Sequence, residues 1–163
     1  MILNAILACD LNNGIGYQND LPWPRHKEDM KWFRENTTGG IVIMGRKTWE
    51  SIGSKPLKDR YNIVLTSNPT KTQGTEYVFV TNLERTIDLL KHTKSNVWII
   101  GGKNIYEQFL PQCDKLYLTK FKQEYKCDKF ISKELLKPFQ KLDYSRNEED
   151  YSFTIWSKID GIQ

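Results

Sequence analysis

Residues 41–52 read IVIMGRKTWESI, and this stretch decides the fold class. It opens with an unbroken apolar run, Ile41–Met44, which is followed at once by Gly45. A run that is apolar at consecutive positions is typical of a strand buried on both faces of a parallel sheet. The next three residues, Arg-Lys-Thr, predict the start of a helix with free N–H groups, a hydroxyl and two cations for a phosphate. An ordinary helix start would show the same pattern.

Short runs rich in β-branched and aromatic residues recur along the chain. We expect strands at Ile2–Cys9, Ile41–Met44, Tyr61–Thr66, Tyr77–Val80, Val97–Ile100, Lys115–Phe121 and Tyr151–Lys158. Apolar residues at helical spacing predict helices between them, at Lys27–Asn36, Leu83–His92 and Asn104–Leu110. Strands and helices alternate up to about residue 110, and the last two strands follow without a comparable helix. The order predicts an α/β fold with a mostly parallel sheet and an antiparallel edge.

The composition excludes several classes of protein. The 163 residues carry 24 basic and 20 acidic side chains, so the net charge of +4 does not indicate nucleic-acid binding. No apolar stretch reaches the roughly 18 to 20 residues that cross a bilayer, so no membrane partner is expected. No shift of composition, repeat or linker divides the chain, and we expect a single domain over residues 1–163.

The cysteines and histidines bear on redox compartment and metal binding. Three cysteines, Cys9, Cys113 and Cys127, are odd in number and do not resemble a disulfide framework, so we expect a reducing, cytoplasmic setting. With two histidines and no Cys-x-x-Cys, we expect no metal site.

Two further glycine turns and one carboxylate stand out. Residues 14–16 and 100–102, Gly-Ile-Gly and Ile-Gly-Gly, would each let the main chain approach a ligand. The first lacks the third glycine of a dinucleotide fingerprint, since Asn19 stands there, and taken alone it is a turn. Asp29 has apolar neighbours, which would raise its pKa and suit binding of a protonated heterocycle. A first-turn Asp favoured by the helix dipole is the alternative.

Taken together, the motifs resemble the dihydrofolate reductase family from Ile2 to about Lys158. They appear in the family's order: Gly14-Ile15-Gly16 with Asn19 and Leu21-Pro22-Trp23, Asp29 with Trp32-Phe33, Val42 to Ile52, Ile100-Gly101-Gly102 with Tyr106 and Phe109-Leu110-Pro111, and Tyr117-Leu118-Thr119. The resemblance implies a central sheet of about eight strands with an antiparallel C-terminal edge, flanked by about four helices. It also implies a cis peptide between Gly101 and Gly102.

The activity that the resemblance implies is NADPH-dependent reduction of 7,8-dihydrofolate to 5,6,7,8-tetrahydrofolate, with hydride passing to pterin C6 and a proton to N5. Asp29 matches the pterin-binding carboxylate, Thr119 the hydroxyl that bonds it, and Trp23 the residue that helps order a water. Arg60 matches the arginine that binds the glutamate α-carboxylate. The pterin and benzoyl pocket would be walled by Ile6, Ala8, Met30, Phe33, Ile52, Leu57 and Ile100.

The same resemblance implies an NADPH site along the glycine turns. Its residues would be Ala8, Ile15, Gly16, Asn19, Asp20, Leu21, Gly45, Arg46, Lys47, Thr48, Thr66, Ser67, Gly101, Gly102, Lys103, Asn104, Ile105 and Tyr106. Thr81 and Asn104 fall where bacterial members often carry Lys and Arg near the 2′-phosphate. We still expect NADPH to be preferred, with Arg46, Lys47 or Lys103 compensating.

The resemblance further implies a cytoplasmic monomer of one-carbon metabolism that binds dihydrofolate and antifolates. Two alternatives stay open. One is a pyrimidine reductase of riboflavin synthesis with the same fold, against which Asp29, Trp23 and Arg60 argue. The other is a folate- or RNA-binding or structural module that has lost catalysis.

Overall fold

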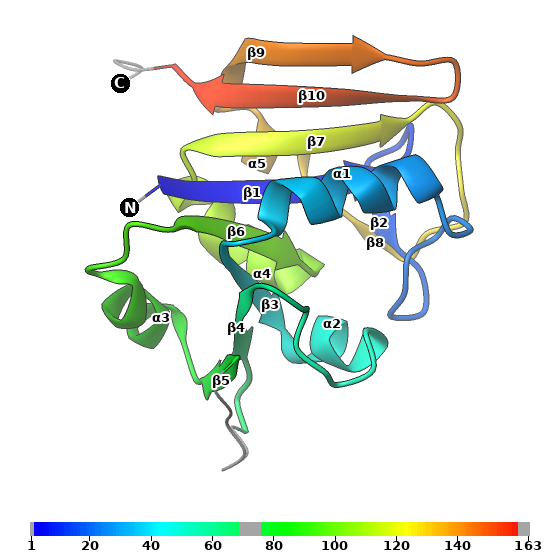
Figure 1. Ribbon diagram of the computed structural model, residues 1–163. Helices are drawn as coiled ribbons and strands as arrows, with labels where there is room; N and C mark the ends of the chain where they lie inside the picture. The colour runs from blue at the N-terminus through cyan, green and yellow to red at the C-terminus, as the bar shows by residue number, and fades with distance from the viewer. Residues whose placement is uncertain (1, 69–75, 160–163) are drawn as a thin grey trace.

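The computed structural model describes residues 2–68 and 76–159, and its centre is a mixed sheet (Figure 1). Within these residues the sheet has eight strands in the order β5-β4-β3-β6-β1-β7-β10-β9. Their bounds are β1 Ile2–Cys9, β3 Ile41–Gly45, β4 Tyr61–Leu65, β5 Tyr77–Val80, β6 Asn96–Gly101, β7 Lys115–Phe121, β9 Phe139–Asn147 and β10 Tyr151–Lys158. The short strands β2 (Gly14–Gly16) and β8 (Lys129–Phe130) pair separately and antiparallel.

The described helices are α1 (Lys27–Thr37), α2 (Arg46–Ser51), α3 (Leu83–Leu90), α4 (Lys103–Phe109) and the single turn α5 (Lys133–Leu136). A short 3₁₀ turn over Leu110–Gln112 follows α4. In Figure 1, α1 lies in front of the sheet and α4 behind it, so the sheet is covered on both faces. None of the described helices is long and apolar enough to span a membrane.

The direction of the strands follows the order in which they alternate with helices. Strands β1, β3, β4, β5, β6 and β7 pair in parallel, and β10 joins β7 and β9 antiparallel. The predicted parallel sheet with an antiparallel C-terminal edge is therefore confirmed. The sequence did not reveal β9, because only its first residue is buried and its composition, FQKLDYSRN, has no apolar run. It is an edge strand paired on one side only, where polar side chains are tolerated.

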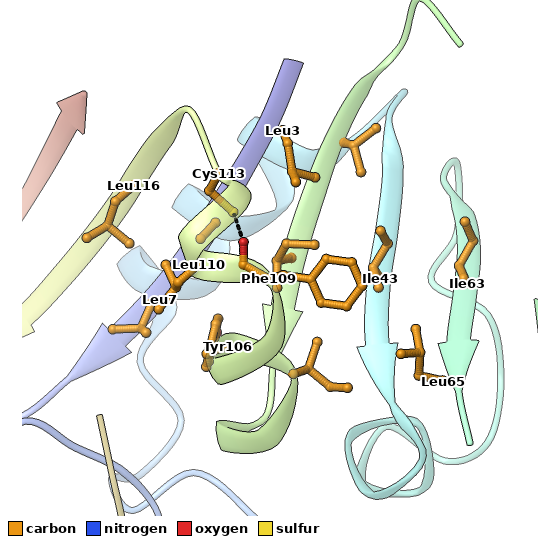
Figure 2. Close-up of a cluster of buried hydrophobic side chains, with 14 of the residues drawn as sticks. Leu3, Leu7, Ile43, Ile63, Leu65, Tyr106, Phe109, Leu110, Cys113 and Leu116 are labelled. Atoms are coloured by element: carbon orange, nitrogen blue, oxygen red, sulfur yellow. Dashed lines mark hydrogen bonds between the residues drawn. The ribbon is translucent and has the colours of Figure 1, made fainter. Parts of the chain in front are cut away.

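Alternation along β1 sends its side chains to two apolar clusters. Leu3 and Leu7 pack behind the sheet with Phe109 of α4, which is fully buried (Figure 2). The thiol of Cys113 donates to the Phe109 carbonyl at 3.3 Å and closes the turn after α4. Ile6 points to the opposite face, into a second cluster that includes Val42, Met44, Trp49, Val64 and Trp98. That second face, under α1, carries the acidic site described next.

Candidate active site

One stripe of α1 faces the sheet and carries an acid at one end. Asp29, Phe33 and Thr37 follow one another at four-residue spacing, which places them on the same side of a helix. At 1.5 Å per residue the stripe is roughly 12 Å long. The helix begins after His26, whose ring Nδ1 accepts a hydrogen bond from the Asp29 backbone N–H at 3.1 Å. The start of α1 therefore fixes where the acid lies.

The Asp29 carboxyl is held by a residue 90 positions later in the chain. Thr119 lies on β7 directly beside Ala8 of β1, and its buried hydroxyl donates to Asp29 Oδ1 at 2.7 Å. Burial raises the pKa of Asp29 above its usual range; the Thr119 hydrogen bond opposes that rise only in part, as would a positive charge on the nearby His26. A carboxyl with a raised pKa in a cleft is suited to binding or exchanging a proton.

Trp23 is a further buried side chain of the predicted catalytic set. It is 6% exposed, and its ring packs against Phe121 and Tyr125 with centroid distances of 4.6 and 5.7 Å. Its indole Nε1 is buried and has no hydrogen-bond partner among the described residues. Buried N–H groups are normally paired, so this donor is suited to a small polar molecule such as water.

The residues predicted to wall the substrate pocket divide into two groups. Ile6 is buried, and Phe33, Leu57 and Ile100 pack against the same cluster. Met30 and Ile52 are 38% and 37% exposed, so they lie at the rim. The apolar wall therefore extends from β1 across α1 to the loop before β4.

Arg60 lies near the other end of the α1 stripe. Its Nη1 donates to Thr37 Oγ1 at 3.1 Å, its Nε donates to the Lys58 carbonyl at 2.8 Å, and its guanidinium lies 5.9 Å from the Phe33 ring centroid. Partial burial lowers the pKa of this guanidinium, which still remains a cation at neutral pH. The site thus has an acid on the first turn of α1 and, beside the last turn of the same helix, the guanidinium of Arg60.

A cavity of about 830 Å³ opens at the carboxyl ends of β1, β3, β4 and β6. In open α/β sheets, ligands gather at such strand ends. Every residue predicted for the cofactor lines this cavity, with the single exception of Gly101. The cavity is also lined by Ser51, Leu65, Thr81, Asn82, Glu107, Gln108, Asp128 and Lys129. Ala8 and Ile100 belong both to this lining and to the predicted pterin wall, so the two sites meet there.

The main chain shapes the floor of the cavity. The peptide between Gly101 and Gly102 is cis, as expected, and Gly101 has a φ of +112°, which side-chain-bearing residues rarely adopt. A Cβ at Gly101 would lie 3.0 Å from the Tyr106 ring, whose hydroxyl donates to the Ile6 carbonyl at 2.7 Å. The glycine therefore allows Tyr106 to pack directly on the strand end.

The donors of the cavity fit a dinucleotide. Hydroxyls of Thr48, Thr66 and Ser67 stand with the cations of Lys47 and Lys103 around the cavity wall, and α2 and α4 start at glycines without side-chain caps. Such a set matches phosphate and ribose oxygens. Arg46 also lines the cavity, but its Nη1 donates to both oxygens of Glu50 at 2.9 and 3.2 Å, which offsets part of its charge.

A family model for dihydrofolate reductase matches residues 2–158. The chain belongs to the dihydrofolate reductase family. It is 42% identical over 131 residues to dihydrofolate reductase of Haemophilus influenzae, covering 80% of this chain and 79% of that protein. It is 35% identical over 164 residues to dihydrofolate reductase of Bacillus subtilis, covering 96% and 95%. As a member, it is an NADP-dependent oxidoreductase with dihydrofolate reductase activity.

Two further similar proteins are a longer bifunctional enzyme and a solved structure with bound ligands. The bifunctional dihydrofolate reductase-thymidylate synthase of Paramecium tetraurelia is 43% identical over 139 residues, and the match spans 84% of this chain but 29% of that protein. Dihydrofolate reductase of Enterococcus faecalis, solved with NADP(H) and RAB-propyl, superposes with a TM-score of 0.87 at 27% identity. That match covers 98% of this chain and 97% of the other.

Two buried polar side chains beside the site escaped sequence reasoning. Asn62 is fully buried on β4, and its side chain accepts from the Leu57 N–H at 2.8 Å while donating to the carbonyls of Leu57 and Arg60 at 3.0 Å. It thereby holds both a pocket wall and the arginine in place. The only sign of this role in the sequence was an asparagine within the apolar strand Tyr61–Leu65, because a buried polar side chain needs hydrogen-bond partners.

Asp10 is the second, at the base of the loop that precedes Trp23. It is fully buried, and its carboxylate accepts from the N–H groups of Asn12, Gly14 and Tyr125 at 2.8 to 2.9 Å. Burial raises the pKa of Asp10, but these donors outweigh it and the net pKa is lowered. A Cβ on Gly14 would lie 2.3 Å from the Cys127 sulfur, so loop and thiol are in direct contact.

Proposed function

We propose that this chain reduces 7,8-dihydrofolate to 5,6,7,8-tetrahydrofolate with NADPH, and that Asp29, Thr119 and Trp23 guide the proton to pterin N5. The observation that carries the proposal is the Asp29 carboxyl, buried and bonded by Thr119 at 2.7 Å, next to a cavity that fits a dinucleotide. The two sites share Ala8 and Ile100, so a pterin beside Asp29 would face a ring at the end of the cavity.

Asp29 would hold the pterin N3 and 2-amino groups through charge-assisted hydrogen bonds. Thr119 keeps one carboxyl oxygen occupied, which directs the other toward the ligand. The unpaired Nε1 of Trp23 would donate to a water near N5 and hold it in line for protonation. The buried carboxylate would stabilise the transition state, in which positive charge develops on the pterin, more than the neutral ground state.

Arg60 would bind the α-carboxylate of the glutamate at the far end of the substrate. A guanidinium fork suits a carboxylate, and the existing bonds to Thr37 and the Lys58 carbonyl hold the side chain in place. The roughly 12 Å between the two ends of the α1 stripe matches a ligand with a heterocycle at one end and a carboxylate at the other.

When bound, NADPH supplies the hydride that passes to pterin C6. The residues that would hold the cofactor are those of the cavity: Thr48, Lys47 and Arg46 for the pyrophosphate, Thr66 and Ser67 for the 2′-phosphate, and residues 101–106 for the nicotinamide side. The loop that carries Ile15 to Leu21 lines the same cavity and would exclude water. We expect NADPH to be preferred over NADH, because Lys47 and Lys103 add positive charge to the wall.

The setting that we propose is that of one-carbon metabolism, supplying tetrahydrofolate for thymidylate and purine synthesis. Residues 1–163 would act as one domain, because strands from both ends of the chain share the central sheet. We also expect a monomer that binds antifolates in the pterin pocket and works in the cytoplasm, where the unpaired thiols of Cys9, Cys113 and Cys127 would stay reduced.

The decisive experiment follows NADPH absorbance with purified protein and dihydrofolate. We expect rapid loss of NADPH that an antifolate stops, and a lower kcat/KM with NADH. Equal kcat/KM for the two cofactors would contradict the expected preference. Saturable pterin binding without turnover would instead indicate a lapsed binding module, and turnover of a ribityl-amino pyrimidine would indicate the riboflavin-pathway reductase.

Arg60→Leu tests the substrate end of the proposal. Charge-assisted hydrogen bonds contribute about 1.5 to 3 kcal/mol each, so we expect the KM for dihydrofolate to rise about 10- to 100-fold while kcat changes little. Steady-state kinetics measure both. An unaltered KM would reject the role of Arg60.

A further inference from the structure

His26 occupies the N-cap position of α1. Its backbone is extended, with φ −111° and ψ 109°, and its carbonyl accepts the Met30 N–H at 3.0 Å. Its ring Nδ1 accepts the Asp29 N–H at 3.1 Å. Ser, Thr, Asp and Asn usually supply this oxygen acceptor, and here an imidazole nitrogen takes their place.

The His26 ring is fixed by the same part of the sheet that holds the Asp29 carboxyl. It lies edge-on to Phe121 at 5.1 Å and to Tyr151 at 4.7 Å between ring centroids. Phe121 follows Thr119 by two residues on β7, and Tyr151 is its register partner on β10. The Asp29 backbone and side chain are thus both held against the neighbouring strands β7 and β10, the backbone through His26 and the side chain through Thr119.

We propose that His26 is a positioning residue for the reduction: its neutral imidazole holds the backbone of Asp29, and protonation of the ring releases it. The proposal rests on the role proposed above for Asp29. An imidazole nitrogen accepts a hydrogen bond only while it carries no proton, and imidazolium has donors alone. Imidazolium at a helix start is also repelled by the positive end of the helix dipole.

Several charged and titratable groups lie around the ring. Glu28 and Asp29 lie on α1, and Tyr151 lies on β10, where Arg146, Glu148 and Asp150 act on it electrostatically. Arg146 also lies 3.9 Å from Glu28. A charged His26 would lower the pKa of Asp29 as well as release its backbone.

The test compares two substitutions. His26→Asn supplies a good capping acceptor that does not titrate, whereas His26→Gln is a similar amide on a longer side chain that caps poorly. An N-cap changes stability by amounts that correspond to about 2- to 30-fold in an equilibrium. We therefore expect kcat/KM of H26Q to fall by a factor in that range at pH 8, and that of H26N to stay close to the wild type. At pH values where NMR shows the His26 ring to be protonated, the wild type should lose kcat/KM relative to H26N.

Amide hydrogen exchange by NMR supplies a readout independent of turnover. In the wild type, protection of the Asp29 N–H should fall as the His26 ring signals titrate, and in H26N it should stay constant. Protection that does not follow the His26 titration, or pH profiles of the wild type and H26N that coincide, would overturn the proposal. Because exchange needs no substrate, it decides the role of His26 even if Asp29→Asn retains turnover.

Discussion

Asp29 is held by two side chains, His26 three residues before it and Thr119 ninety residues after it, whereas the neighbouring cavity is lined by many residues at the ends of four strands. His26 accepts the Asp29 backbone N–H, and Thr119 donates to the Asp29 carboxyl. The cavity is instead lined by glycines, hydroxyls and the starts of α2 and α4. We expect that replacing a single side chain at Asp29 or Thr119 will reduce activity. Binding in the cavity should weaken markedly only when a substitution forces the main chain to move.

The largest effect should come from Asp29→Asn. Positioned acids and bases contribute about 10²- to 10⁴-fold, so the hydride step at neutral pH should slow by at least about 100-fold. Single-turnover kinetics with NADPH measure this step. An unchanged rate would remove Asp29 from the mechanism.

The same variant should be more stable than the wild type at neutral pH. Burial raises the pKa of Asp29 in the folded state, so its contribution to stability is fully present below the unfolded-state pKa and is lost as pH rises through the folded-state pKa. Replacing the charge should recover that loss above this range, and the gain should vanish near pH 3. Urea unfolding at both pH values tests the sign. Greater stability of the wild type at pH 7 would contradict it.

Gly101→Ala should break the cavity through its main chain. The positive φ and the 3.0 Å approach of a Cβ to the Tyr106 ring predict a loss of about 1 to 3 kcal/mol in the free energy of unfolding, with weaker NADPH binding. Gly102→Ala is the matched control for stability, because its Cβ would meet nothing closer than Thr48 Oγ1 at 3.7 Å. Thermal unfolding measures the loss of stability in both variants, and cofactor titration measures the weaker binding by Gly101→Ala. Equal losses of stability in the two variants would count against the steric argument.

Thr119→Val should have the smallest effect and refine the comparison. Removing the hydroxyl deletes a donor that lowers the pKa of Asp29, so that pKa should rise further. The limb of the pH–rate profile governed by Asp29 should move to higher pH, with a loss of about 10-fold or less in kcat/KM at neutral pH. Thr119→Ser keeps the hydroxyl and should restore the wild-type profile. A shift of the same size in both variants would mean that packing, not the hydrogen bond, controls the acid.

The strand-end part of the molecule was predictable because its signals are local. Residues 41–48 predict a strand, a turn at Gly45 and the start of a helix within a few positions, and the cavity lies at that turn. The pairing of Asp29 with Thr119 joins residues 90 positions apart, and only the family resemblance indicated it. Asp128 and Lys129 reach the cavity through the β2–β8 pair, for which two exposed residues of β8 gave no pattern.

The contact between Gly14 and Cys127 also sets a rule for divergence among related chains. A Cβ at position 14 would overlap the thiol at 2.3 Å, so the two positions share one volume. The Cys127 Cβ would also lie 2.8 Å from that atom, so a relative that gains a side chain at the equivalent of 14 should carry glycine at the equivalent of 127. The two substitutions should be less harmful together than the first is alone, which predicts covariation between two positions 113 residues apart in the sequence.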